Sequence, residues 1–236
     1  MAFDPNIIGS VVTAVGALGI AASALVDASK TLPGGGVSNI GFSSIKAAVN
    51  LFLPALVADP SVSATAATPG SLLDTLHANW INGMPVADQK AVAKSLIKLK
   101  LSPATAMVYA AATQVDAKVL TDVATCMTTG EALNAAQSNT LGRFDLALTA
   151  ILDAAYQRAE QRYRNACKAW AGVVAIVLAG LGGATVGDGS FNDYLHSSML
   201  WMSLFCGVLA VPLAPITKDL SSALSAGVKV AQSLKR

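Results

Sequence analysis

The chain has 236 residues, of which 53% are hydrophobic and only 13% are charged, and its formal net charge at pH 7 is +2. The charged share is about half that of an average soluble domain, which leaves few polar side chains to cover the surface of a free protein in water. The small net charge gives no indication of a nucleic-acid-binding protein.

Three stretches carry no Asp, Glu, Lys or Arg: the 22 residues of 5–26, the 19 residues of 169–187 and the 24 residues of 194–217. At about 1.5 Å per residue, each forms a helix long enough to cross a hydrocarbon layer of about 30 Å. Strand signals are weak throughout. We therefore predict an all-α integral membrane protein with about three transmembrane helices.

Residues 1–30 are predicted to form the first transmembrane helix. No Lys or Arg precedes its apolar core, whereas Asp4 does, so the segment does not have the pattern of a secretory signal peptide. Small residues recur every four positions along one face, at Gly9, Thr13, Ala17 and Ala21. Such a face lets helices approach closely in lipid, so we expect it to pack against another span or another subunit.

Residues 31–140 are predicted to comprise a glycine-rich break, an interfacial helix and a helical cytoplasmic region. The apolar stretch 39–57 contains Lys46 and Pro54, and its charge-free part is short for a crossing. An interfacial or re-entrant helix suits it best. A fourth span over 39–57 is the alternative, and it would place the N-terminus in the cytoplasm.

A stripe of lysines at Lys90, Lys94 and Lys98 follows one face of a predicted amphipathic helix. Such a helix can lie on the anionic headgroups of the inner leaflet, to which each lysine contributes about 1 kcal/mol. The same pattern also describes a solvated face over a small helical core. The sequence leaves these two interpretations equally open.

Residues 141–236 are predicted to form a basic helix, a transmembrane hairpin (169–187 and 195–217) and a cytoplasmic tail. The helical rhythm from residue 141 is expected to run unbroken into the second span. Basic residues precede that span, and the short loop after it contains only acidic charges, Asp188 and Asp193. The positive-inside rule then places both roots of the hairpin and the C-terminus in the cytoplasm. The basic residues are Arg158, Arg162, Arg164 and Lys168.

The glycine-rich end of the second span resembles a phosphate-binding loop, but Asp188 occupies the position where that motif needs lysine. The glycines and alanines of this span are better explained as a stripe of small residues, spaced four apart, that lets another helix pack closely. This stripe consists of Ala171, Ala175, Ala179, Gly183 and Gly187.

The basic helix, the two-span hairpin, the motif "VPLAPITKDL" and a short amphipathic tail together resemble bacterial inner-membrane proteins of unassigned function. The resemblance covers about the last 95 residues. It implies a location in the bacterial inner (cytoplasmic) membrane and implies no particular activity.

Catalytic and metal-binding patterns are weak. His77 and His196 have no partner at ligand spacing, and no motif for a cofactor or metal is present. We therefore expect no enzyme, no cofactor and no nucleic-acid partner. The predicted function is that of a structural, anchoring or assembly subunit in a lipid bilayer, as a homo-oligomer or as part of a larger membrane complex. A homo-oligomeric pore or channel is the alternative.

Overall fold

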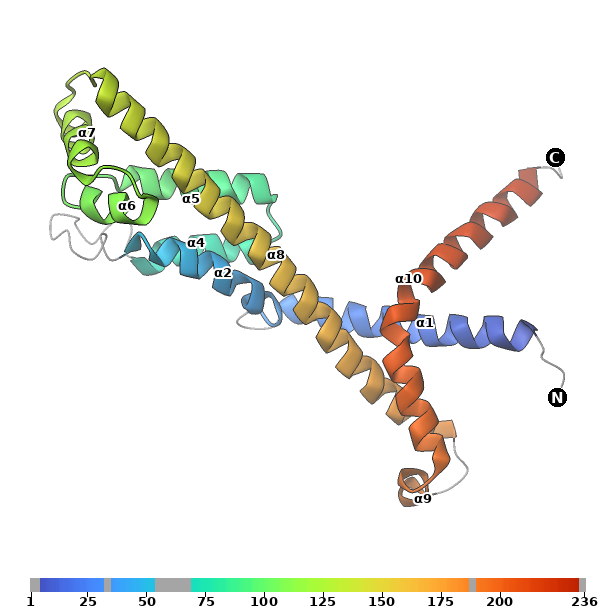
Figure 1. Ribbon diagram of the computed structural model, residues 1–236. Helices are drawn as coiled ribbons and strands as arrows, with labels where there is room; N and C mark the ends of the chain where they lie inside the picture. Colours follow the sequence, from blue (N-terminus) through green and yellow to red (C-terminus); the bar gives the residue numbers. More distant parts are fainter. Residues whose placement is uncertain (1–4, 32–34, 54–68, 187–189, 234–236) are drawn as a thin grey trace. The chain divides into compact units, whose positions relative to one another are not determined.

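The computed structural model describes residues 5–31, 35–53, 69–186 and 190–233, and within these ranges the chain is helical with no strand (Figure 1). The helices are α1 (Pro5–Ala28), the short 3₁₀ turn η1 (Ser29–Thr31), α2 (Ser38–Asn50), α4 (Pro69–Ile81), α5 (Val86–Leu99), α6 (Ala106–Thr113), α7 (Ala117–Thr129), α8 (Ala135–Val186), α9 (Phe191–Leu195) and α10 (Ser198–Ser233).

Two compact units divide the chain. One combines Met1–Val37 with Arg164–Arg236, and we call it the spanning unit. The other is Ser38–Tyr163, which lies between those two segments in sequence and which we call the inserted unit. The 52-residue helix α8 contributes to both units, as the unbroken rhythm of its sequence predicts. The division falls between Tyr163 and Arg164, whereas the sequence-based division is at residue 140.

The spanning unit contains the apolar helices. Among the described residues, three helices are long and apolar enough to cross a membrane, and they are α1, α8 and α10. The prediction of an all-α integral membrane protein with about three transmembrane helices is therefore confirmed. Large apolar side chains cover the outward faces of α8 and α10, where lipid replaces water as the solvent. They include Trp170, Val173, Val177 and Leu181 on α8, and Trp201, Met202, Phe205 and Val208 on α10.

The helix that contains the third span extends beyond the predicted range of 195–217, although the apolar stretch itself is Ser198–Asp219. A separate short helix, α9, precedes it, and α10 then continues through Pro212 and Pro215 to Ser233. Figure 1 shows α10 changing direction along its length. Proline within a helix removes a backbone hydrogen bond and bends the chain, but spanning helices tolerate it. The two prolines therefore lie inside the helix and do not end it.

The inserted unit packs its helices around a core of apolar side chains. On α8, Phe144, Leu148, Leu152 and Tyr156 are all buried, and their spacing of four residues places them on one helical face. The ring of Phe144 stacks on Tyr109 of α6, with centroids 6.2 Å apart. The first part of α8 is therefore the central helix of this core.

Helix α2 belongs to the same core. It is 13 residues long, which is too short to cross a membrane, and it buries Phe42, Ile45 and Val49. A Cβ atom at Gly41 would lie 2.8 Å from the Ala159 carbonyl oxygen of α8, so the two helices are in close contact. The described part of 39–57 is thus not among the helices long enough to cross a membrane, and its apolar face packs against protein. Residues 54–57 lie outside the described residues.

Candidate functional site

Helices α1 and α10 meet through glycine. A Cβ atom at Gly16 would overlap the side chain of Thr217, and one at Gly19 would overlap the carbonyl group of Ala210. The Thr217 hydroxyl, which is buried, donates a hydrogen bond of 3.4 Å to the Val12 carbonyl oxygen. The two backbones can approach this closely only because neither glycine carries a side chain.

Helices α8 and α10 meet in a similar way. A Cβ atom at Gly207 would lie 2.6 Å from the Cα atom of Ile176. One at Gly183 would overlap the Ser203 hydroxyl and lie 2.6 Å from the Tyr194 hydroxyl. Ala22 of α1, Ala175 of α8 and Ala210 of α10 form the small core where the three helices meet. Glycine and alanine therefore stand at the closest approaches of these helices, and partly buried valine and leucine side chains pack around them.

The predicted small-residue stripe on α8 lies in this contact. Ala171, Ala175 and Ala179 are buried, and Gly183 faces α10. Gly187 lies outside the described residues.

The predicted stripe on α1 lies on the opposite face of its helix. Thr13, Ala17 and Ala21 are exposed, while the surroundings of Gly9 are not described. The face of α1 that packs within the chain consists instead of Gly16, Gly19, Ala22 and Val26. Alanine and serine occur on every side of α1, so a spacing of four residues does not by itself identify the packed face.

The lysine stripe of α5 is paired with carboxylates of α8. Lys90 Nζ lies 2.6 Å from Asp153, Lys94 Nζ lies 2.6 Å from Asp145, and Lys98 Nζ lies 2.8 Å from Asp145. Hydrogen bonds from Lys94 and Lys98 hold the pKa of the Asp145 carboxyl below its ordinary value. The lysines therefore join α5 to α8. The sequence alone had also allowed them to contact lipid headgroups.

Sequence reasoning missed Asp145 and Asp153. A signal for them exists in the register, because Lys90 and Lys98 are eight residues apart and so are Asp145 and Asp153. Lys90 pairs with Asp153, and Lys98 pairs with Asp145. The order of the residues is thus reversed between the two helices, so α5 and α8 run antiparallel. Eight residues make about two turns of helix, so the two lysines on α5 and the two aspartates on α8 are equally far apart and both pairs can form.

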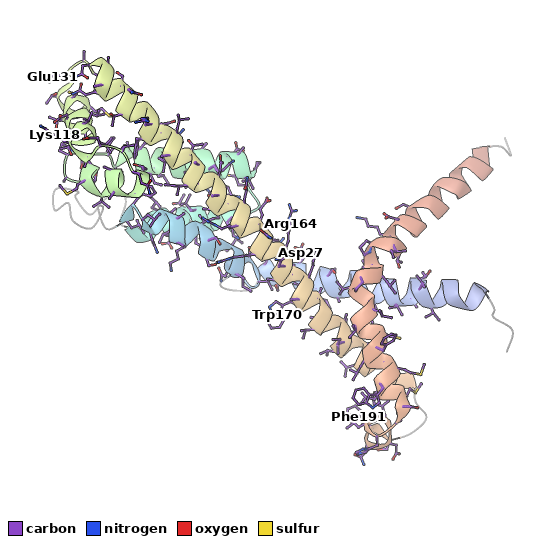
Figure 2. All side chains as sticks on the ribbon, in the orientation of Figure 1. Asp27, Lys118, Glu131, Arg164, Trp170 and Phe191 are labelled. Carbon is purple, nitrogen blue, oxygen red and sulfur yellow. The ribbon has the colours of Figure 1, made fainter. Side chains whose placement is uncertain are left out.

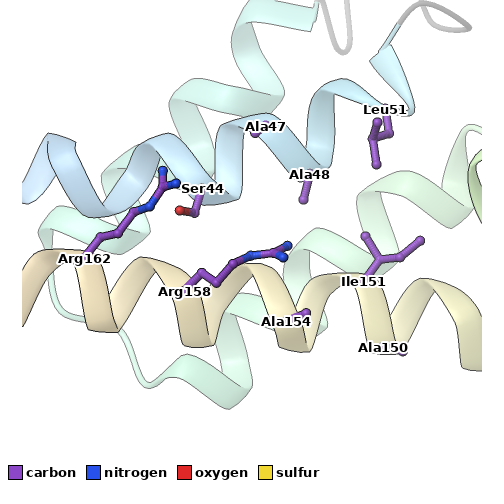
Figure 3. Close-up of a pocket in the computed structure, with 9 residues that line it drawn as sticks. All are labelled: Ser44, Ala47, Ala48, Leu51, Ala150, Ile151, Ala154, Arg158 and Arg162. Carbon is purple, nitrogen blue, oxygen red and sulfur yellow. The ribbon is translucent and has the colours of Figure 1, made fainter.

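A hollow lies between α2 and α8, and we call it the arginine groove (Figure 3). Its volume is about 630 Å³. Figure 3 shows the side chains of Arg158 and Arg162 directed from α8 toward α2, and Ser44 on the side of α2 that faces them. The groove is lined by Ser44, Ala47, Ala48, Leu51, Ala150, Ile151, Ala154, Arg158 and Arg162.

The other two predicted basic residues, Arg164 and Lys168, are exposed on α8. Figure 2 marks Arg164 and Trp170 on this helix, six residues apart, where its charged part gives way to the charge-free window. Arg158 and Arg162 thus line a groove in the inserted unit, whereas Arg164 and Lys168 belong to the spanning unit.

The two histidines have structural surroundings. His77 Nε2 lies 2.7 Å from the Asn39 side-chain oxygen, and its ring packs on Phe42 with centroids 4.7 Å apart. His196 follows the last residue of α9 as its C-cap. In the part of the chain that the structure describes, no group of three His, Cys, Asp or Glu residues could hold a metal ion.

Asp193 completes a capping box with Ser190 at the start of α9, and Asp188 lies outside the described residues. A carboxylate that accepts a backbone N–H in a capping box stabilises the helix start. Asp193 therefore has a structural part in the loop between the second and third spans.

The chain was compared with family models, curated proteins and solved structures, and none of them matches the chain.

Proposed function

We propose that the chain is a non-enzymatic anchoring and assembly subunit of a complex in the bacterial inner membrane. The observation that carries this proposal is the difference between the outer faces of the spanning helices. The exposed faces of α8 and α10 bear large apolar side chains such as Trp170 and Phe205, which suit lipid. The exposed side of α1 also carries large side chains, among them Ile20 and Leu25, but a stripe of small residues lies between these two: Thr13, Ala17 and Ala21.

Small residues on an exposed face suit a helix partner better than lipid. The closest helix approaches described within the spanning unit are at glycine and alanine, so the same chemistry on the exposed stripe of α1 supports a further contact of this kind. A second copy of the chain or a spanning helix of another subunit would supply the partner. The exposed face of α1 is then the assembly face.

The basic residues at the roots of the hairpin support an orientation with the inserted unit and the C-terminus in the cytoplasm. Arg164 and Lys168 precede the second span, and Lys218 follows the third. The N-terminus of α1 would lie on the other side of the membrane. In this arrangement the spanning unit holds the inserted unit at the cytoplasmic surface.

The assembly face can be tested by adding bulk to it. We expect the purified wild-type chain to run in mild detergent as a complex larger than its own 23.9 kDa. The double variant Ala17→Leu/Ala21→Leu should run at the mass of the single chain, because leucine prevents close approach of a partner helix. Native mass spectrometry, together with co-purification of two differently tagged copies, measures both.

The matched control is Gly182→Leu on α8. Gly182 is exposed, and a Cβ atom there would contact nothing within 4 Å, so the variant adds a leucine side chain to an outer face that we assign to lipid. It should leave the complex intact. A wild-type chain that runs alone, or a double variant with unchanged mass, would contradict the proposal. A steady, ion-selective current through bilayers containing the purified protein would favour the homo-oligomeric pore instead.

A further inference from the structure

The arginine groove carries two like charges on one helical face. Arg158 and Arg162 are four residues apart on α8, so their guanidinium groups repel each other across one turn. The residues that line the groove include no carboxylate. Arg162 Nη1 donates a long hydrogen bond of 3.4 Å to the Ser43 hydroxyl. An anion between the two guanidinium groups would relieve this repulsion.

A buried hydroxyl lies beside these charges. Ser44 is only 6% exposed, and its Oγ atom has no hydrogen-bond partner among the residues that the structure describes. Buried hydroxyl groups in proteins are nearly always hydrogen-bonded, so a lone one at the wall of a cavity points to a polar group that is bound there. Figure 3 places Ser44 and Arg162 at the same end of the groove.

The remainder of the groove is apolar. Figure 3 shows Leu51, Ala150 and Ile151 at the end away from Arg162. The alanines leave the space between the helices open, and about 630 Å³ is a typical volume for a small-ligand site. A ligand that fills the groove therefore needs an anionic head and an apolar tail.

The charges favour a phosphate head over a carboxylate. A phosphate monoester carries between about −1.5 and −2 charges at pH 7 and offers three strong acceptor oxygens. Two guanidinium groups and one hydroxyl match that charge and that number of acceptors. A carboxylate brings one charge and two oxygens, which leaves one arginine uncompensated.

The position of the groove along α8 favours a ligand drawn from the membrane. Arg162 precedes Ala169, the first residue of the charge-free window, by seven residues in the sequence. We propose that the arginine groove binds a single-chain lipid with a phosphate monoester head, with the phosphate between Arg158 and Arg162 and the acyl chain along the apolar wall. This site is separate from the assembly face on α1 and does not depend on assembly.

The test uses the full-length chain in detergent and 1-oleoyl lysophosphatidate as the probe, with binding measured by native mass spectrometry. We expect saturable binding of one lipid per chain. Lysophosphatidylcholine with the same acyl chain should bind at least tenfold more weakly, because its phosphate carries a compensating positive charge. Glycerol 3-phosphate, which lacks the tail, should also bind at least tenfold more weakly. Equal binding of all three probes, or no binding of lysophosphatidate, would overturn the proposal.

Variants separate a built site from general charge attraction. Arg158→Gln/Arg162→Gln should weaken lysophosphatidate binding at least tenfold, and Ala154→Leu should weaken it several-fold by filling the groove. Arg164→Gln removes the same charge from the same helix outside the groove, and it should have little effect. Equal losses in the double variant and in Arg164→Gln would show attraction by charge alone and would overturn the site. The arginines are exposed, so their variants keep the core intact and decide the question even where Ala154→Leu does not fold.

Discussion

Asp145 lies on α8 and accepts hydrogen bonds from two lysines of α5, Lys94 and Lys98. We predict that Asp145→Asn loosens α5, because the neutral amide no longer pairs with Lys94 and Lys98. Both pairs are partly exposed, so the expected loss is about 1 kcal/mol in total. Hydrogen exchange followed by mass spectrometry should show protection of the α5 amides reduced about fivefold.

The same carboxylate predicts a pH dependence. Its pKa in the folded chain is lowered, so its contribution to stability is present above the unfolded value of about 3.9 and is lost as the pH falls through the folded value. Urea unfolding of wild type and Asp145→Asn should therefore differ at pH 7, and the difference should shrink as the pH falls below about 4. Asp122→Asn, at an exposed position on α7, is the control and should match wild type at pH 7. A constant difference between wild type and Asp145→Asn across this range would contradict the role of the ion pairs.

At the scale of the helices, glycine positions in the spanning unit fall into two classes. A Cβ atom at Gly207 would press on the backbone of α8, whereas one at Gly180 would contact nothing within 4 Å. We predict that Gly207→Ala destabilises the packing of α8 on α10 by about 1–3 kcal/mol. Gly180→Ala should be neutral or slightly stabilising, because alanine favours helix by up to about 1 kcal/mol. Thermal unfolding in detergent micelles measures both.

These two variants test the α8–α10 contact directly, because each adds one methyl group to a glycine of a spanning helix. If Gly207→Ala were as stable as Gly180→Ala, the close contact at Ile176 would not exist in the folded protein.

How far the sequence predicts these elements depends on what each pattern contains. The spans follow from charge-free windows, because composition alone decides whether a helix can lie in lipid. The burial of Ala175 follows from its stripe, since the glycine at its end marks the close contact. The packed face of α1 does not follow, because small residues such as Ala17 and Ala22 occur on both sides of that helix.

Long-range pairing was the part that the sequence could not provide. The lysine stripe predicts a polar face, but its partners Asp145 and Asp153 lie 47 to 63 residues away in the sequence. Likewise, the apolar face of α2 predicts burial without indicating whether lipid or protein covers it. The arginine groove likewise depends on a long-range contact, because it forms only where α2 packs on α8.

For the whole molecule, the orientation in the membrane is the property that can be tested most directly. We predict that a cysteine at Asn192, in a background without Cys126, Cys167 and Cys206, reacts with a membrane-impermeant maleimide from outside the inner membrane. Asn192 is exposed at the start of α9, whereas the neighbouring Ser190 caps that helix and is better left intact. The bacteria used need only a permeabilised outer membrane.

The matched position is Lys118→Cys, on an exposed site of α7 in the inserted unit. It should react only after the inner membrane is broken. The reverse result at both positions would mean that the inserted unit lies outside the cytoplasm, in conflict with the basic roots of the hairpin.

The division of the spanning unit in sequence has a consequence during synthesis. About 170 residues separate the end of α1 at Ala28 from the start of α10 at Ser198. At 5–20 residues per second, the ribosome completes α1 roughly 10–30 s before it begins α10. During this interval Gly16 and Gly19 have no partner helix, while the whole inserted unit emerges and can fold. A new molecule therefore has a single span until the apolar part of α8 is made, and the contact between α1 and α10 forms last.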